Sequence, residues 1–174
     1  MRILFVVFWL QFLVLASCEY GDVHGSAASS DIILGFKEKP TEVFSFRSGT
    51  NDFTGFFVSE FSEAAKTYFE NPPSEFYQHP KALSYEKGHT FVHWRATPVE
   101  TGHQFLRNRV ESLLRNHQID SKWAANTRKL LNDEDCFYAV SYEDYGSGRY
   151  DNITFYLLDP SSRQLTQITD TSSF

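Results

Sequence analysis

The feature that most constrains this chain is an uncharged apolar run near its start, residues 3–15, which is interrupted only by Gln11. A transmembrane helix needs about 20 apolar residues, and this run is shorter. A single cation, Arg2, precedes the run, whereas acidic residues follow it. A short positive head, an apolar centre and small residues behind it form the layout of a cleaved export signal. We therefore expect the folded domain to lie entirely after this segment.

The signal-like segment ends in the tetrapeptide Leu15-Ala16-Ser17-Cys18. This ending resembles the lipobox of bacterial lipoprotein precursors, and the resemblance is confined to residues 1–18. It implies that Cys18 is lipidated and becomes the first mature residue. A thiolate is the nucleophile that would take the lipid, and stable anchoring takes at least two acyl chains. The resemblance thus implies a protein held at the cell envelope by an N-terminal lipid.

The alternative is an ordinary secretory signal that is cut after Cys18, with Ala16 and Cys18 as the small residues at the cleavage site. The protein would then be freely secreted. Glu19 stands directly after the cysteine, where the resemblance associates an aspartate with retention in the inner membrane. The resemblance therefore favours the outer membrane, with the domain facing the periplasm or the cell surface.

The rest of the chain divides into a tether and one domain. Residues 19–30 are rich in Gly, Ala and Ser and hold almost no apolar bulk, which is typical of a flexible linker. Residues 31–174 have the length of a single domain. Aromatic residues make up 17% of the chain, which argues against disorder because their side chains bury large areas.

The pattern of the domain predicts an α+β fold. Short β-rich runs bounded by turn signals predict strands at 31–36, 42–47, 53–59, 90–96, 136–144, 149–159 and 164–169. The last three, joined by short turns, predict an antiparallel meander. Periodic apolar positions predict helices at 59–70, 97–116 and 120–132, and the last two should form a helical hairpin. We expect an antiparallel sheet with this hairpin and the third helix packed on one face.

Each of the three predicted helix starts carries a capping signal. Thr97-Pro98-Val99-Glu100 has the spacing of a capping box, with the proline at the first helical position. Asp120 or Ser121 is placed to begin the next helix. Ser59 is placed in the same way before the residues 61–68, whose apolar positions form one stripe.

The formal charge of the chain is −6, which does not favour nucleic acid as a partner. The charge is unevenly placed, because residues 95–129 carry seven basic and three acidic residues. The simplest interpretation is two helices with solvated cationic faces. The sharper one is a basic patch that meets anionic lipid or an acidic partner.

Known catalytic constellations are missing from the sequence. We find no nucleophile elbow, phosphate loop or dinucleotide fingerprint, and we expect no catalytic residues, no cofactor and no metal. His89 and His93 lie on one face of a predicted strand but about 13 Å apart, too far to share one ion. Cys136 has the flanks of a small core residue.

A binding role is therefore the main hypothesis, with an envelope protein as the expected partner, in which case the domain could act as an inhibitor. Tyr138 and Tyr142 should share one face of a strand, as should Tyr150 and Tyr156. If the two faces coincide, these four tyrosines form an aromatic interaction surface.

Two alternatives stay open beside the binding role. One is a secreted enzyme that uses the long connection Pro72–Gly88 together with His79, His89, His93 and His103. The other is a ligand-binding protein with a cavity under the sheet.

Overall fold

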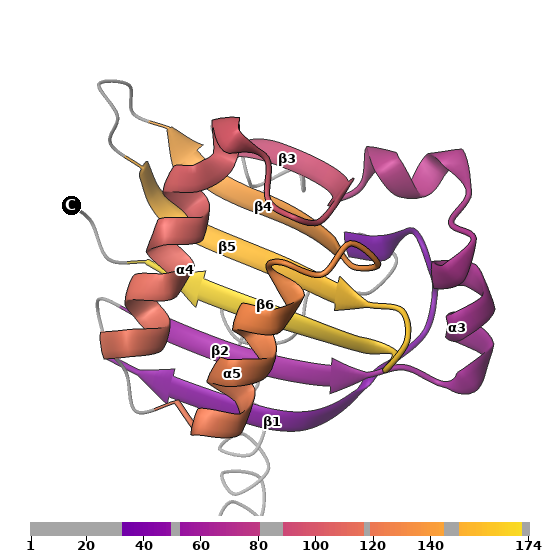
Figure 1. The fold of residues 1–174 in the computed structure, drawn as a ribbon, viewed down its shortest axis with the longest axis horizontal. Helices are drawn as coiled ribbons and strands as arrows, with labels where there is room; N and C mark the ends of the chain where they lie inside the picture. Colours follow the sequence, from indigo (N-terminus) through magenta and orange to yellow (C-terminus); the bar gives the residue numbers. More distant parts are fainter. Residues whose placement is uncertain (1–32, 50–52, 81–88, 117–118, 145–149, 172–174) are drawn as a thin grey trace, which may run out of the picture.

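The computed structural model describes residues 33–49, 53–80, 89–116, 119–144 and 150–171, and Figure 1 shows their arrangement. The predicted signal segment, Cys18 and the tether lie outside the described residues. Within the described ranges, no helix combines the length and the hydropathy that a membrane crossing requires.

The domain is α+β, as predicted, and is built on one six-stranded sheet in the order β1-β2-β6-β5-β4-β3. Every neighbouring pair of strands is antiparallel. The strands are β1 Thr41–Ser48, β2 Thr54–Glu60, β3 His89–Ala96, β4 Phe137–Asp144, β5 Tyr150–Asp159 and β6 Gln164–Asp170. The predicted C-terminal meander is confirmed, because β4, β5 and β6 are neighbours in the sheet. The ends of these strands lie within two residues of the predicted ends.

The helices are α3 Glu63–Glu70, α4 Gln104–Asn116 and α5 Ser121–Leu130, with short 3-10 turns η1 Ser74–Gln78 and η2 Thr101–His103. Helices α4 and α5 follow each other and cover one face of the sheet (Figure 1). They enclose the first core cluster with β2, β4, β5 and β6. Its fully buried large members are Phe56, Leu106, Leu130, Leu131, Tyr138, Phe155 and Leu157.

The second core cluster lies on the opposite face of the sheet. Neighbouring residues on a strand point to opposite faces, and Ala139, Tyr156 and Leu158 belong to this cluster while Tyr138 and Leu157 belong to the first. Helix α3 and η1 contribute further apolar side chains, among them Ala65, Phe69 and Phe76. The third helix therefore differs from its predicted place, because it packs on the face that the hairpin leaves open.

The start of the domain also differs from the prediction. Ile33 and Leu34 are helical rather than extended, and both are buried in the second core cluster. Trp94 Nε1 donates a hydrogen bond to the Ile33 carbonyl at 2.6 Å, and the Tyr68 hydroxyl donates to the Leu34 carbonyl at 3.1 Å. A short apolar run fits a strand and a helix turn equally well, so these tertiary contacts decide its structure.

The helix starts follow their capping signals in one case of three. Asp120 caps α5, since its carboxylate accepts from the Lys122 N–H at 2.8 Å. Ser59 instead lies within β2, and α3 begins later, with Ser62 at its N-cap position. Thr97 does not cap α4, because its hydroxyl donates to the Asp133 carbonyl and its helix begins only at Gln104 after η2.

Candidate functional site

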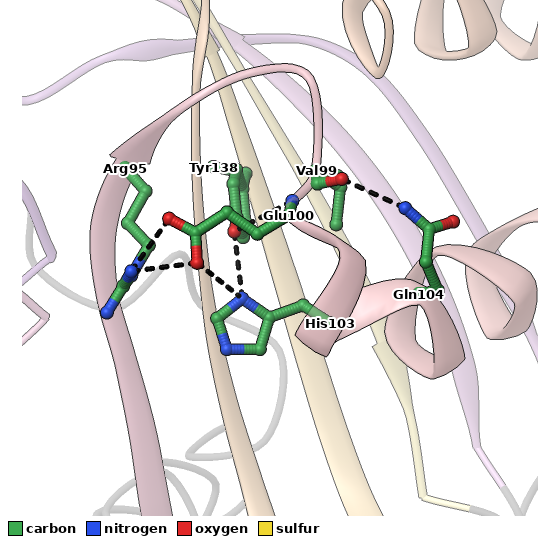
Figure 2. A network of polar contacts seen from close by, with 6 residues as sticks. All are labelled: Arg95, Val99, Glu100, His103, Gln104 and Tyr138. Atoms are coloured by element: carbon green, nitrogen blue, oxygen red, sulfur yellow. Dashed lines mark hydrogen bonds and ion pairs between the residues drawn. The ribbon is translucent and has the colours of Figure 1, made fainter.

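A polar network joins the start of α4 to the sheet at β4 and β3, and Figure 2 shows its members. Its buried centre is Tyr138 of β4, whose side chain is fully enclosed and stacks on Phe155 with ring centroids 6.0 Å apart. The Tyr138 hydroxyl lies 2.8 Å from Nδ1 of His103, at the end of η2. The Glu100 backbone N–H donates to the same hydroxyl at 3.4 Å.

The outer part of the network is charged and half exposed. Arg95 of β3 donates from Nη1 to both carboxylate oxygens of Glu100, at 2.7 and 2.9 Å. The second of these oxygens lies 3.9 Å from His103 Nδ1. Gln104 donates from Nε2 to the Val99 carbonyl at 2.9 Å. Glu100 and His103 are thus held by tertiary partners, and the carboxylate predicted to complete a capping box serves Arg95 instead.

The electrostatics of the network favour a neutral phenol at its centre. Burial raises the pKa of Tyr138, and the nearby Glu100 carboxylate raises it further, against the lowering effects of the Glu100 backbone N–H and of Arg95. The hydrogen bond with Glu100 is the main reason why the pKa of Arg95 is raised. The phenol does not ionise at physiological pH. Its hydrogen bond with the imidazole therefore serves to hold η2 and the start of α4 against the sheet.

An open hollow of about 410 Å³ lies along α5, and it is lined by Lys122, Trp123, Ala125, Asn126, Lys129 and Gln164. The indole of Trp123 stacks on Phe44 of β1 with ring centroids 5.4 Å apart. The Lys122 ammonium lies 5.1 Å from the centroid of the same indole. This side of the hollow therefore combines a fixed aromatic surface with a cation beside it.

The cations of the predicted basic patch differ in whether they form ion pairs. Three of them have carboxylate partners, in the pairs Arg95–Glu100, Arg109–Asp170 and Arg128–Glu111. Among the described residues, no ion pair involves Lys122 or Lys129, both of which line the hollow. The positive charge of this region is therefore partly neutralised within the domain, and the hollow retains two lysines.

The tyrosines do not form the predicted aromatic surface. Tyr138 is fully buried in the first core cluster, and Tyr142 packs against that cluster. Tyr156 is 7% exposed and belongs to the second cluster, on the opposite face. The register explains the separation, because Tyr156 pairs with Ala139 rather than with Tyr138. The side chain of Tyr150 lies outside the described residues.

The histidines and the cysteine of the domain are dispersed. His103 belongs to the network of Tyr138, His79 is buried beside η1, and His93 is exposed on β3. In the described part of the chain, no three His, Cys, Asp or Glu side chains lie close enough to hold a metal ion. Burial raises the pKa of Cys136 to about 12. Cys136 is thus a core residue, as predicted.

Sequence reasoning missed both the network and the hollow. The spacing of Glu100 and His103 was a usable signal for the network, because residues three apart on a helical turn are neighbours. Tyr138 lies 35 residues from His103 along the chain, and no pattern links the two. Comparison of the chain with protein-family models, curated proteins and solved structures gave no match.

Proposed function

We propose that this chain is a lipid-anchored protein of the cell envelope whose folded domain is a non-catalytic binding module. The lipid is carried by Cys18, as the lipobox resemblance of residues 1–18 implies. The binding surface is the hollow along α5, and the partner is a protein of the same compartment that presents an acidic segment. The observation that carries this proposal is the placement of two lysines without ion-pair partners, within the described residues, beside a stacked tryptophan.

The aromatic part of the hollow suits a protein partner. Tryptophan is among the residues that most often dominate binding energy at interfaces. The indole of Trp123 is already held by its stack on Phe44, so that little side-chain freedom is lost when a partner covers it. Pre-ordered contact surfaces bind more tightly because the entropic cost of ordering them is not part of association.

The charged part of the hollow suits an acidic partner. Lys122 and Lys129 are seven residues apart on α5, which places them on one side of the helix about 10 Å apart along its axis. Carboxylates of an extended or helical segment can meet both ammonium groups. Exposed charges of this kind raise the association rate and exclude cationic partners more than they raise affinity.

The first test concerns the anchor. The mature protein is isolated from its host with detergent, and its intact mass and N-terminal peptide are measured. A chain that starts at Cys18 and carries added acyl mass supports the anchor. A chain that starts at Glu19 without lipid contradicts it and favours the secreted alternative.

The second test concerns the hollow. A photo-cross-linking amino acid replaces Ala125, which is exposed in the hollow, and the full chain is irradiated in its host. We expect an adduct whose yield falls about tenfold in the double variant Lys122→Glu/Lys129→Glu. The matched control is Lys37→Glu/Lys39→Glu, which changes the charge equally at two exposed lysines before β1.

Each outcome of the cross-linking decides the proposal. An adduct that survives charge reversal in the hollow, or that disappears equally in the control variant, contradicts an acidic partner at this site. An identified adduct with no acidic segment in its cross-linked peptide contradicts it as well. The proposal stands when the hollow variant alone loses the adduct.

A further inference from the structure

We propose that the outer edge of β1 pairs with β1 of a second copy of this chain, so that two six-stranded sheets join into one. Strand β1 is the last strand of the sheet, and among the described strands it bonds only to β2. A free edge carries unpaired backbone N–H and C=O groups, which are a template for another strand. The proposal goes beyond the proposed function, because it rests on β1 rather than on the hollow.

The faces of β1 determine which register the pairing takes. Phe44 and Phe46 pair with Val58 and Phe56 and contact the first core cluster. Ser45 and Arg47 therefore point to the opposite face. This is consistent with the Arg47 guanidinium, which lies 5.1 Å from the ring centroid of Phe57.

An antiparallel pairing with its two-fold axis at Ser45 places aromatic side chains of the two copies opposite each other on one face. Residues directly opposite in two antiparallel strands share a face, so Phe44 meets Phe46 of the second copy, and Phe46 meets its Phe44. Both rings are only partly buried in the single domain. Cross-strand aromatic pairs are among the pairs that stabilise a sheet most.

The same register matches opposite charges on the other face. The register of β1 against β2 shifts between Glu42 and Phe44, which makes Val43 the extra residue of a bulge. Glu42 pairs with Ser59, two positions from the partner of Ser45, and so lies on the same face as Arg47. In the two-fold pairing, Arg47 of each copy lies beside Glu42 of the other.

The exposed apolar side chain of Val43, in the bulge, is consistent with a second copy covering this edge. Proteins commonly protect a free edge with charged side chains and bulges. Here the bulged residue is apolar, and Val43 is 42% exposed, one of two exposed large hydrophobic side chains among the described residues. A second copy would cover it next to the Glu42–Arg47 contact.

Cysteine cross-linking in the full chain tests the pairing. In Ser45→Cys, two copies of residue 45 face each other at the axis, and mild oxidation should give a covalent dimer on a non-reducing gel. Thr90→Cys is the matched control, because Thr90 is exposed on β3, the opposite edge of the sheet. The unsubstituted chain controls for Cys18 and Cys136, the native cysteines.

Charge swaps in the Ser45→Cys background test the register. Glu42→Arg and Arg47→Glu each place like charges together, so each alone should lower the cross-linked fraction about tenfold. Coexpression of the two variants should restore it, because both contacts in the mixed dimer are then between opposite charges. Thermal unfolding of each variant checks that the domain still folds.

The cross-linking results distinguish the proposed pairing from its alternatives. Absence of a Ser45→Cys dimer in folded protein, or equal cross-linking of Thr90→Cys, overturns the pairing. A dimer that persists in both single swaps overturns the register and with it the proposal. Variants of Lys122 and Lys129 should leave the dimer intact, so that failure of the dimer and failure of the binding hollow are distinguishable.

Discussion

The phenol oxygen of Tyr138 lies 2.8 Å from Nδ1 of His103, and this contact ties the start of α4 to strand β4 of the sheet. The two residues come from elements that are separated by the whole helical hairpin. Tyr138 is fully buried, whereas His103 borders the half-exposed pair of Arg95 and Glu100. The network therefore runs from the core to the surface at one end of α4.

Removing the Tyr138 hydroxyl should weaken this anchor without disturbing the core. Tyr138→Phe keeps the stack on Phe155 but loses the hydrogen bond with His103. We expect the free energy of unfolding to fall by about 1 kcal/mol, measured by urea unfolding. Tyr77→Phe is the control, because Tyr77 is 44% exposed and should lose almost nothing. An equal loss in both variants would show that the buried hydroxyl contributes no more stability than an exposed one.

The ion pair between Arg109 and Asp170 should be the most sensitive charged contact of the domain. Asp170 is 2% exposed, so Arg109→Met leaves a buried carboxylate without this cation. We expect a loss of about 3 kcal/mol in the free energy of unfolding. Arg128→Met removes the more exposed pair with Glu111 and should cost less than about 1 kcal/mol. A cycle that adds Asp170→Asn should show coupling; additive losses would mean the two groups act independently.

The turn after β5 should contribute stability that depends on acid pH. Burial acts to raise the pKa of Asp159, but hydrogen bonds from Ser162 and Ser161 outweigh it and hold the pKa below its usual 3.8. A lowered pKa means stability that is fully present above about pH 4 and is lost as the pH falls through the folded pKa.

The variant Asp159→Ala tests this sign. We expect it to lose about 2 kcal/mol of the free energy of unfolding at pH 7. The difference from the parent chain should shrink as the pH falls below about 3.8, because the carboxylate then protonates in the unfolded chain while the folded protein still holds it ionised. Urea unfolding at several pH values measures both. A difference that grows as the pH falls would contradict the direction of the shift.

The thiol of Cys136 should be inert in the folded protein. Burial is the main cause that raises its pKa to about 12, and the thiolate is the reactive form. We expect no labelling of the Cys136 peptide by a maleimide at pH 8 within the time that labels it fully in urea. Mass spectrometry of the peptide follows both reactions. Rapid labelling without denaturant would show that the core around Cys136 opens readily.

The positions of most strands could be predicted from the amino-acid sequence. The alternation of residues 90–96 and the turn signals around residues 146 and 160 depend on local chemistry, which the chain carries wherever it folds. The same holds for the Asp120 cap, whose partner is the Lys122 N–H, only two residues away. The Asp120 carboxylate and the Lys122 N–H are close together along the chain, and no distant group among the described residues competes for this cap, so the sequence alone could predict it.

The contacts between residues far apart in the chain could not be predicted, because they depend on how the elements pack. Thr97 and Glu100 have the spacing of a capping box, yet they bind Asp133 and Arg95 because the fold brings those groups within reach. Tyr138 and Tyr156 lie on opposite faces because β4 and β5 pair with Tyr156 beside Ala139. A shift of one residue moves every side chain of a strand to the other face. The sequence pattern of a strand shows which of its residues share a face. The pairing with the neighbouring strand determines which side of the sheet that face is on.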